Sequence, residues 1–113
     1  MSSYADQLDA TGLVTAILEK TRVGKLKWEE TASDVVFIAS VGGDTTLKVS
    51  RYDSGGSPPY YQCTLSLLDE NGKLLWEIEQ PERMLDGLFT LARRVALRVD
   101  EKVDALLNTL QKL

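Results

Sequence analysis

The chain has 113 residues, of which 43% are hydrophobic and 27% are charged, a balance that predicts one folded domain over residues 1–113 and excludes a disordered chain. Its net charge of −4 argues against general attraction to nucleic acid or to an anionic membrane. Because there is no histidine and only one cysteine, Cys63, the sequence excludes histidine catalysis, a Cys/His metal site and an internal disulfide.

The N-terminal region predicts a helix after a polar start. We expect residues 1–8 to be flexible. They show no secretory signal, and no stretch of the chain approaches the roughly 20 apolar residues of a membrane span, so we expect a cytoplasmic protein. From about Asp9 the apolar residues recur at helical spacing, with Asp9 or Thr11 as the capping residue and Gly24 as the end. These apolar residues are Leu13, Val14, Ile17 and Leu18.

The central region predicts an antiparallel sheet. Leu26 and Trp28 alternate with charged residues, which indicates a short extended segment. Beyond it, apolar and polar residues alternate over about 35–41, 45–52, 60–68 and 73–79, which predicts four strands. Gly42-Gly43 and Asn71-Gly72 are typical of tight hairpins, and a Gly/Ser/Pro-rich loop joins the middle pair of strands. Such short links favour a meander with one face toward water.

The C-terminal region predicts helix after Pro81, with an apolar stripe from Met84 to Leu110. A single helix here would be about 45 Å long, more than a small domain needs, so we expect a break near Arg98–Asp100 with Asp100 capping a final short helix. An unbroken helix is the alternative, and its overhang would form a dimer surface. The fold class is therefore α+β: an N-terminal helix, a four-stranded antiparallel meander, and a long or broken C-terminal helix packed on one sheet face.

A group of arginines is the first candidate binding site. Arg93 and Arg94 are adjacent, and Arg94, Arg98 and Lys102 are spaced by four, so these three share one helix face. A guanidinium group matches a phosphate or a carboxylate by two-point contact, which predicts a phosphorylated ligand, a nucleotide or an acidic partner. The alternative is a solvated ridge balanced by neighbouring carboxylates such as Asp100.

Two tyrosines are the second candidate. Tyr52 and Tyr60 flank the Gly/Ser/Pro-rich loop, where they could stack on a ligand base or simply pair across strands. Cys63 falls on the predicted inward face, where a free cysteine packs as a small hydrophobe. No residue pattern indicates a catalytic group, a metal site or a cofactor.

Two segments carry a resemblance to known proteins. The stretches 18–31 and 91–107, with their Leu-Glu-Lys-Thr and Leu-Ala-Arg-Arg runs, resemble the opening and the ending of a group of small bacterial proteins of unknown function. The resemblance implies the same helix–sheet–helix order and a bacterial or phage source, and it carries no catalytic residue across. In that group a glycine often precedes the Val-Asp pair, where this chain has Arg98.

Two functional hypotheses follow from these features. The first is a non-enzymatic binding module that acts on a protein partner or on a second copy, as a homodimer, through the C-terminal helix or the exposed sheet face. The second is a binder of a nucleotide or phosphorylated signal, such as a sensor or a phage-encoded sponge or inhibitor, that uses the arginines and tyrosines. An enzyme ranks third.

Overall fold

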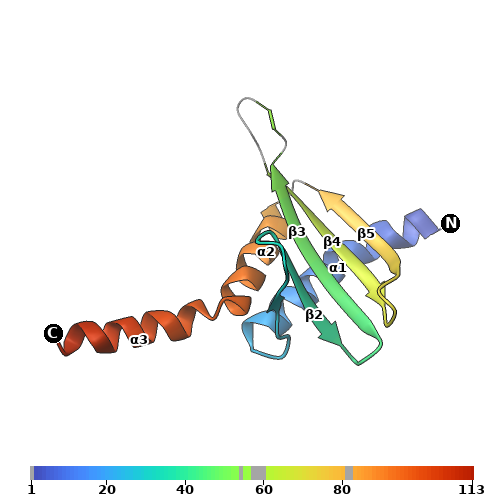
Figure 1. Ribbon diagram of the computed structural model, residues 1–113. Helices are drawn as coiled ribbons and strands as arrows, with labels where there is room; N and C mark the ends of the chain where they lie inside the picture. Colours follow the sequence, from blue (N-terminus) through green and yellow to red (C-terminus); the bar gives the residue numbers. More distant parts are fainter. Residues whose placement is uncertain (1, 54, 57–60, 81–82) are drawn as a thin grey trace.

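A five-stranded antiparallel sheet forms the centre of the protein in the computed structural model, which describes residues 2–53, 55–56, 61–80 and 83–113 (Figure 1). The elements in chain order are α1 (Ser2–Arg22), β1 (Glu29–Glu30), β2 (Val36–Val41), β3 (Thr45–Asp53), β4 (Tyr61–Asp69), β5 (Leu74–Gln80), α2 (Arg83–Ala96) and α3 (Val99–Gln111). The predicted α+β class and antiparallel meander are confirmed.

The sheet has the strand order β1-β2-β3-β4-β5, so each strand pairs with the next one in the chain. The β2–β3 hairpin turns at Gly42 and Gly43, whose φ angles of 70° and 90° suit glycine because it has no Cβ. A register shift at Leu67/Leu68 interrupts the β4–β5 pairing. The expectation of four strands is wrong by one: Glu29 and Glu30 form the short strand β1 against Ile38 and Phe37.

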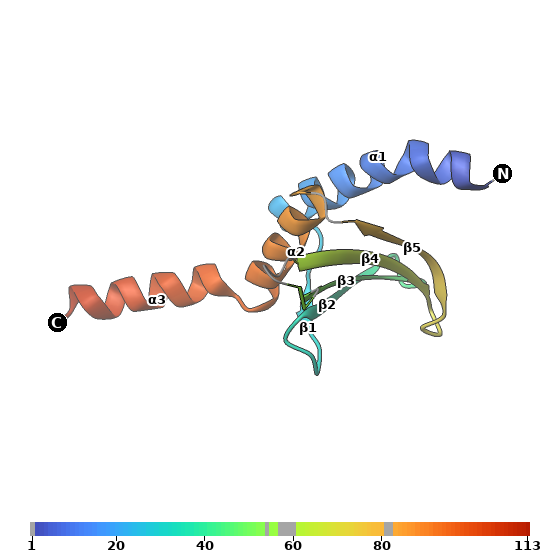
Figure 2. The same cartoon turned by 90° about the horizontal axis from the view of Figure 1, so that it is seen from above.

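Helices α1 and α2 cover one face of the sheet, as Figure 2 shows from above. The core lies between them and the strands, where Phe37, Val49 and Leu65 meet Leu88 and Phe89 of α2. The rings of Phe37 and Phe89 lie 5.6 Å apart in a tilted arrangement, a geometry that aromatic pairs favour. Other buried members of the core are Val14, Ile17, Leu26, Trp28, Ala39, Leu47, Cys63, Leu85 and Ala92.

The helix α1 differs from its prediction at the start and matches it at the end. It begins at Ser2 rather than near Asp9, so Asp9 and Thr11 lie within the helix and do not cap it. Gly24, with a φ of 80°, follows the last turn as expected. The expected flexibility of residues 1–8 stays a prediction.

The opposite sheet face is mostly polar, as expected, although half-buried Val36 and Ile38 of β2 also lie on it. Two of its polar side chains are buried. Thr64 and Ser66 of β4 are 6% and 1% exposed. Ser66 pairs in register with Lys48 and Glu77, and its hydroxyl donates a 3.0 Å hydrogen bond to the Glu77 carboxylate. Small hydroxyl side chains on a central strand are thus covered by the longer chains of its neighbours.

The C-terminal helical region is broken, the first of the two alternatives. Helix α2 packs on the sheet, whereas α3 extends away from it and has no buried residue (Figures 1 and 2). The prediction that the whole region packs on one sheet face is therefore wrong for α3. The radius of gyration, 16.0 Å, exceeds the roughly 13 Å of a compact chain of this length because α3 projects. No helix among the described residues is long and apolar enough to cross a membrane.

Candidate functional site

Helix α3 displays a row of exposed apolar side chains that we call the α3 stripe. It consists of Val103, Leu106, Leu107 and Leu110, each between 47% and 57% exposed. Just beyond the helix, Leu113 is 92% exposed. Apolar side chains that gather on one exposed surface, rather than being scattered singly, are typical of an interaction site. The sequence predicted this stripe, but it could not show that the sheet leaves it uncovered.

The junction between α2 and α3 is a left-handed turn at Arg98. Its φ and ψ angles are 54° and 45°, and it is the one non-glycine residue with positive φ in the described part of the chain. The backbone N–H of Arg98 donates to the carbonyl of Val95 at 3.1 Å, which closes the last turn of α2. The left-handed residue then redirects the chain into α3.

An ion pair spans this junction. The Nε and Nη2 atoms of Arg94 lie 2.8 and 2.7 Å from Oδ1 of Asp100. The expectation that Asp100 caps α3 is wrong: Arg98 occupies the capping position without a side-chain cap hydrogen bond, and Asp100 lies in the first turn. There its charge still suits the positive end of the helix dipole. The pair links the last turn of α2 to the first turn of α3.

A hollow of about 1070 Å³ opens beside the junction, and we call it the junction hollow. The end of α1, the strand β1 and both C-terminal helices line it. Its cationic side chains are Arg22, Lys27, Arg94, Arg98 and Lys102, and its anionic ones are Glu29, Glu30, Asp100 and Glu101. The buried Trp28 also lines the hollow, and its indole N–H donates a 3.0 Å hydrogen bond to Thr21. The hollow is therefore a charged depression, with the buried Trp28 beneath it.

The residues singled out by sequence are only partly brought together. Arg94 and Arg98 both line the junction hollow, whereas Arg93 is exposed and does not line it. Tyr52 follows the inward-facing Arg51 and therefore points to the opposite sheet face, where its hydroxyl donates to Glu79 at 3.2 Å. Tyr60 lies outside the described residues. The structure therefore does not place Tyr52 beside the arginines.

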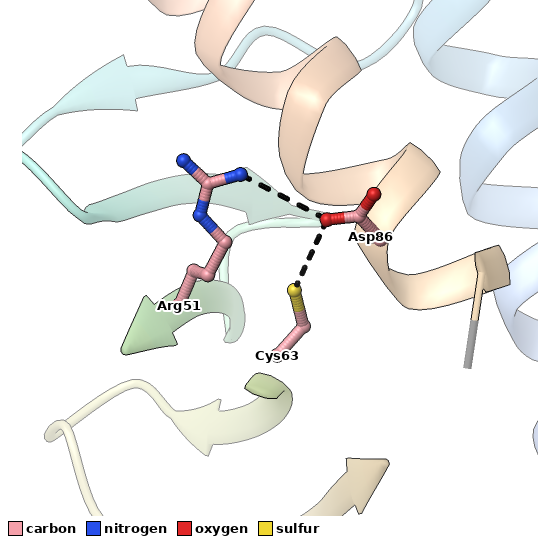
Figure 3. A network of polar contacts seen from close by, with 3 residues as sticks. All are labelled: Arg51, Cys63 and Asp86. Carbon is pink, nitrogen blue, oxygen red and sulfur yellow. Dashed lines mark hydrogen bonds and ion pairs between the residues drawn. The ribbon is translucent and has the colours of Figure 1, made fainter. Parts of the chain in front are cut away.

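A polar cluster beneath α2 was not predicted. Figure 3 shows Arg51 of β3 and Cys63 of β4 both directed at Asp86 of α2. Nη1 of Arg51 lies 3.8 Å from Oδ1 of Asp86, and the Cys63 thiol approaches the same oxygen at 3.9 Å. The Arg51 guanidinium also lies 4.5 Å from the ring centre of Phe89, within cation–π range. The signal in the sequence was an arginine in line with Leu47 and Val49 on the inward face of its strand.

The chemistry of this cluster favours a neutral thiol. Burial raises the pKa of Cys63 above its ordinary value of 9.0, and the Asp86 carboxylate raises it further, while Arg51 acts in the opposite direction. A thiol held in its protonated form is a poor nucleophile. The arrangement instead joins α2 to β3 and β4 through one charged and one weak contact. We therefore regard it as structural.

A comparison with protein-family models, curated proteins and solved structures found no match to this chain. Among the described residues, no three Cys, Asp or Glu side chains are grouped so that they could hold a metal ion. The candidate sites are therefore the α3 stripe and the junction hollow, which lie on successive parts of the same helical region.

Proposed function

We propose that this protein is a non-enzymatic interaction module that forms a homodimer through the α3 stripe. The observation that supports this proposal is a 13-residue helix that projects from the fold with no buried residue and with its apolar side in water. An isolated helix of fewer than about 12–15 residues is only marginally stable in water, and most protein helices gain their stability by packing an apolar face. A second chain would supply that packing.

We also propose that the module works in the cytoplasm. Its single cysteine is buried and free, which suits a reducing compartment.

The test is the mass of the protein in solution, measured by light scattering after size exclusion and by sedimentation. We expect the wild-type chain to form a dimer. Leu106→Glu should weaken the dimer at least about tenfold, because burying one leucine contributes roughly 1.5–3 kcal/mol and the carboxylate must also be desolvated. Asn108→Glu, on the exposed side of α3 away from the stripe, is the matched control and should remain dimeric.

Two results would contradict this proposal. One is a wild-type chain that stays monomeric at its highest soluble concentration. The other is a Leu106→Glu variant that dimerises as well as the Asn108→Glu control. Circular dichroism of both variants establishes that the sheet and the helices are intact, so that loss of the dimer is not mistaken for unfolding.

The junction hollow supports a second candidate function, the binding of a small phosphorylated ligand. Four of its cations, namely Arg22, Lys27, Arg98 and Lys102, have no ion-pair partner among the described residues. Arginine and lysine side chains that converge on a concavity are suited to phosphate groups, since guanidinium forks match them in two-point contact. The acidic residues of the hollow oppose this effect, which is why the α3 stripe is the leading proposal.

Thermal shift with a panel of nucleotides and inorganic phosphate tests this second candidate. A ligand of the hollow should raise the melting temperature of the wild-type chain and of Arg93→Gln, because Arg93 lies outside the hollow. Arg98→Gln should lose the shift. If no compound of the panel stabilises the wild-type chain, or if Arg98→Gln responds equally, the hollow does not bind this class of ligand.

A further inference from the structure

We infer that a groove between α1 and α2, the α1–α2 groove, binds a long-chain carboxylate such as a free fatty acid. This site is separate from the α3 stripe and does not depend on the proposed dimer. The groove has a volume of about 690 Å³, which is within the range of small-molecule sites. Its apolar lining consists of Leu18 of α1 with Met84 and Leu91 of α2. Leu18 and Leu91 are half-buried and Met84 is exposed, so the groove opens to solvent.

One end of the groove is positively charged. Arg22 and Arg94 line both the α1–α2 groove and the junction hollow, so they lie where the two meet. Arg94 is paired with Asp100, which lines the hollow and not the groove, whereas Arg22 has no ion-pair partner among the described residues. None of the described carboxylates lines the groove, although the chain as a whole has a net charge of −4. This end therefore suits an anionic head group.

A glycine forms the middle of the groove. Gly87 lies within α2, where glycine is unfavourable compared with other residues. A Cβ at this position would meet no atom within 4 Å, so no close packing requires glycine here. Its absent side chain leaves space for a ligand between Met84 and Leu91. From Met84 to Arg94 the helix extends about 15 Å, close to the length of an extended laurate chain.

The size and polarity of the groove favour a fatty acid over a protein segment. A stable protein interface involves about 20–30 residues on each side, whereas seven residues line this groove. Apart from the arginines, Thr90 is the one described lining residue whose side chain can form hydrogen bonds, so the backbone of an extended peptide would find few partners. An acyl chain needs none, and its carboxylate matches the guanidinium group of Arg22.

Titration of the full-length chain with laurate tests this site, followed by amide NMR and by calorimetry. We expect saturable binding that shifts the amide signals of Leu18, Gly87 and Leu91. Hexanoate has the same head group on a shorter chain and should bind at least about tenfold more weakly, because it buries fewer methylene groups.

Filling the groove should remove the site. Gly87→Leu should weaken laurate binding at least about tenfold, because the leucine side chain occupies the space of the acyl chain. Gly12→Leu is the matched control. Gly12 is also an exposed glycine within a helix where a Cβ meets no atom within 4 Å, but it does not line the groove. Circular dichroism and thermal unfolding of both variants check that the fold is intact.

Charge removal gives an independent measure that does not depend on filling the groove. Arg22→Gln should weaken laurate binding by about twofold to fivefold, the size expected for an exposed ion pair. Arg93→Gln removes the same charge outside the groove and should bind laurate like the wild-type chain. Arg98→Gln should also bind laurate normally, because Arg98 lines the junction hollow only.

Four results would overturn this inference. They are a wild-type chain that shows no saturable binding of laurate, equal binding by Gly87→Leu and Gly12→Leu, loss of binding in Arg98→Gln, and binding to phosphatidylglycerol vesicles without binding of free laurate. If Gly87→Leu does not fold, equal binding by Arg22→Gln and Arg93→Gln overturns it instead. A monomeric wild-type chain that binds laurate would contradict the proposed homodimer and support the groove.

Discussion

Arg98 shows how one backbone conformation determines where α3 points. Its left-handed φ of 54° is disfavoured for a residue with a Cβ, because the Cβ approaches the following carbonyl oxygen. Glycine is the usual residue at such a helix end. The Arg98 N–H bond to the Val95 carbonyl lies on the α2 side of this residue, and the exposed Arg94–Asp100 pair spans the turn.

Replacing Arg98 with glycine should therefore stabilise the folded chain. Relief of the left-handed strain contributes about 1–2 kcal/mol, and the greater freedom of glycine in the unfolded chain offsets roughly 0.5–1 kcal/mol of this. We expect urea unfolding to show a free energy of unfolding about 0.5–1 kcal/mol above that of Arg98→Ala, which removes the same charge and keeps the strain. Equal stabilities of the two variants would contradict this reading of the junction.

Helix α1 carries a buried hydrogen-bond chain at its C-terminal end. Thr21, 3% exposed, donates to the carbonyl of Ile17 at 2.7 Å and accepts from the indole N–H of Trp28 at 3.0 Å. The second bond connects α1 to the segment that leads into β1. A threonine in the last turn of a helix thus satisfies the polar atom of a buried tryptophan, which would otherwise be unpaired.

Thr21→Val should test this contact, since valine has nearly the same shape and no hydroxyl. The Trp28 N–H would lose its acceptor inside the protein, and we expect the free energy of unfolding to fall by about 1–3 kcal/mol. Thr15→Val, at an exposed position of the same helix, should change it by less than about 0.5 kcal/mol. Chemical denaturation followed by tryptophan fluorescence gives both values, and comparable losses in the two variants would show that the buried bond is not the cause.

At the scale of the whole molecule, the structure consists of a folded body, formed by α1, the sheet and α2, and a projecting arm, which is α3. The body contains every buried residue of the core, and α3 contributes none of them. The principal extents of 62 × 41 × 25 Å reflect this division. The arm is connected to the body through the Arg98 turn and the exposed Arg94–Asp100 pair, which is 59% and 72% exposed at its two side chains.

A chain that ends at Arg98 should therefore fold. The loss of α3 removes the Arg94–Asp100 pair, worth about 0–1 kcal/mol when exposed, and no core contact. When the full-length chain is diluted to its monomeric form, the two should unfold cooperatively at similar denaturant concentrations. At high concentration only the full-length chain should gain stability, because the proposed dimer forms through α3. Loss of cooperative unfolding in the shortened chain would show that α3 packs on the body after all.

Local patterns predicted most of the elements. Alternation along β2, β3 and β4 predicted that core residues such as Phe37, Val49 and Leu65 share one face, because successive side chains of a strand point to opposite faces. The sequence predicted a short extended segment around β1 but did not count it as a strand of the sheet, because two glutamates have little strand preference. They form a strand because they pair with the free edge of β2.

By itself the sequence determined the α+β class and the meander, since each depends on spacing along the chain. It favoured a break in the C-terminal helical region but left an unbroken helix as the alternative. Tertiary structure alone decided that α3 leaves the sheet, that Arg94 and Arg98 share a hollow while Tyr52 lies on the other sheet face, and that Arg51 meets Asp86 and Cys63. The contacts of Asp86 with Arg51 and Cys63 join residues that lie far apart in the chain. Whether such contacts form depends on how whole helices and strands pack against one another to bury apolar surface. A short stretch of sequence does not contain that information.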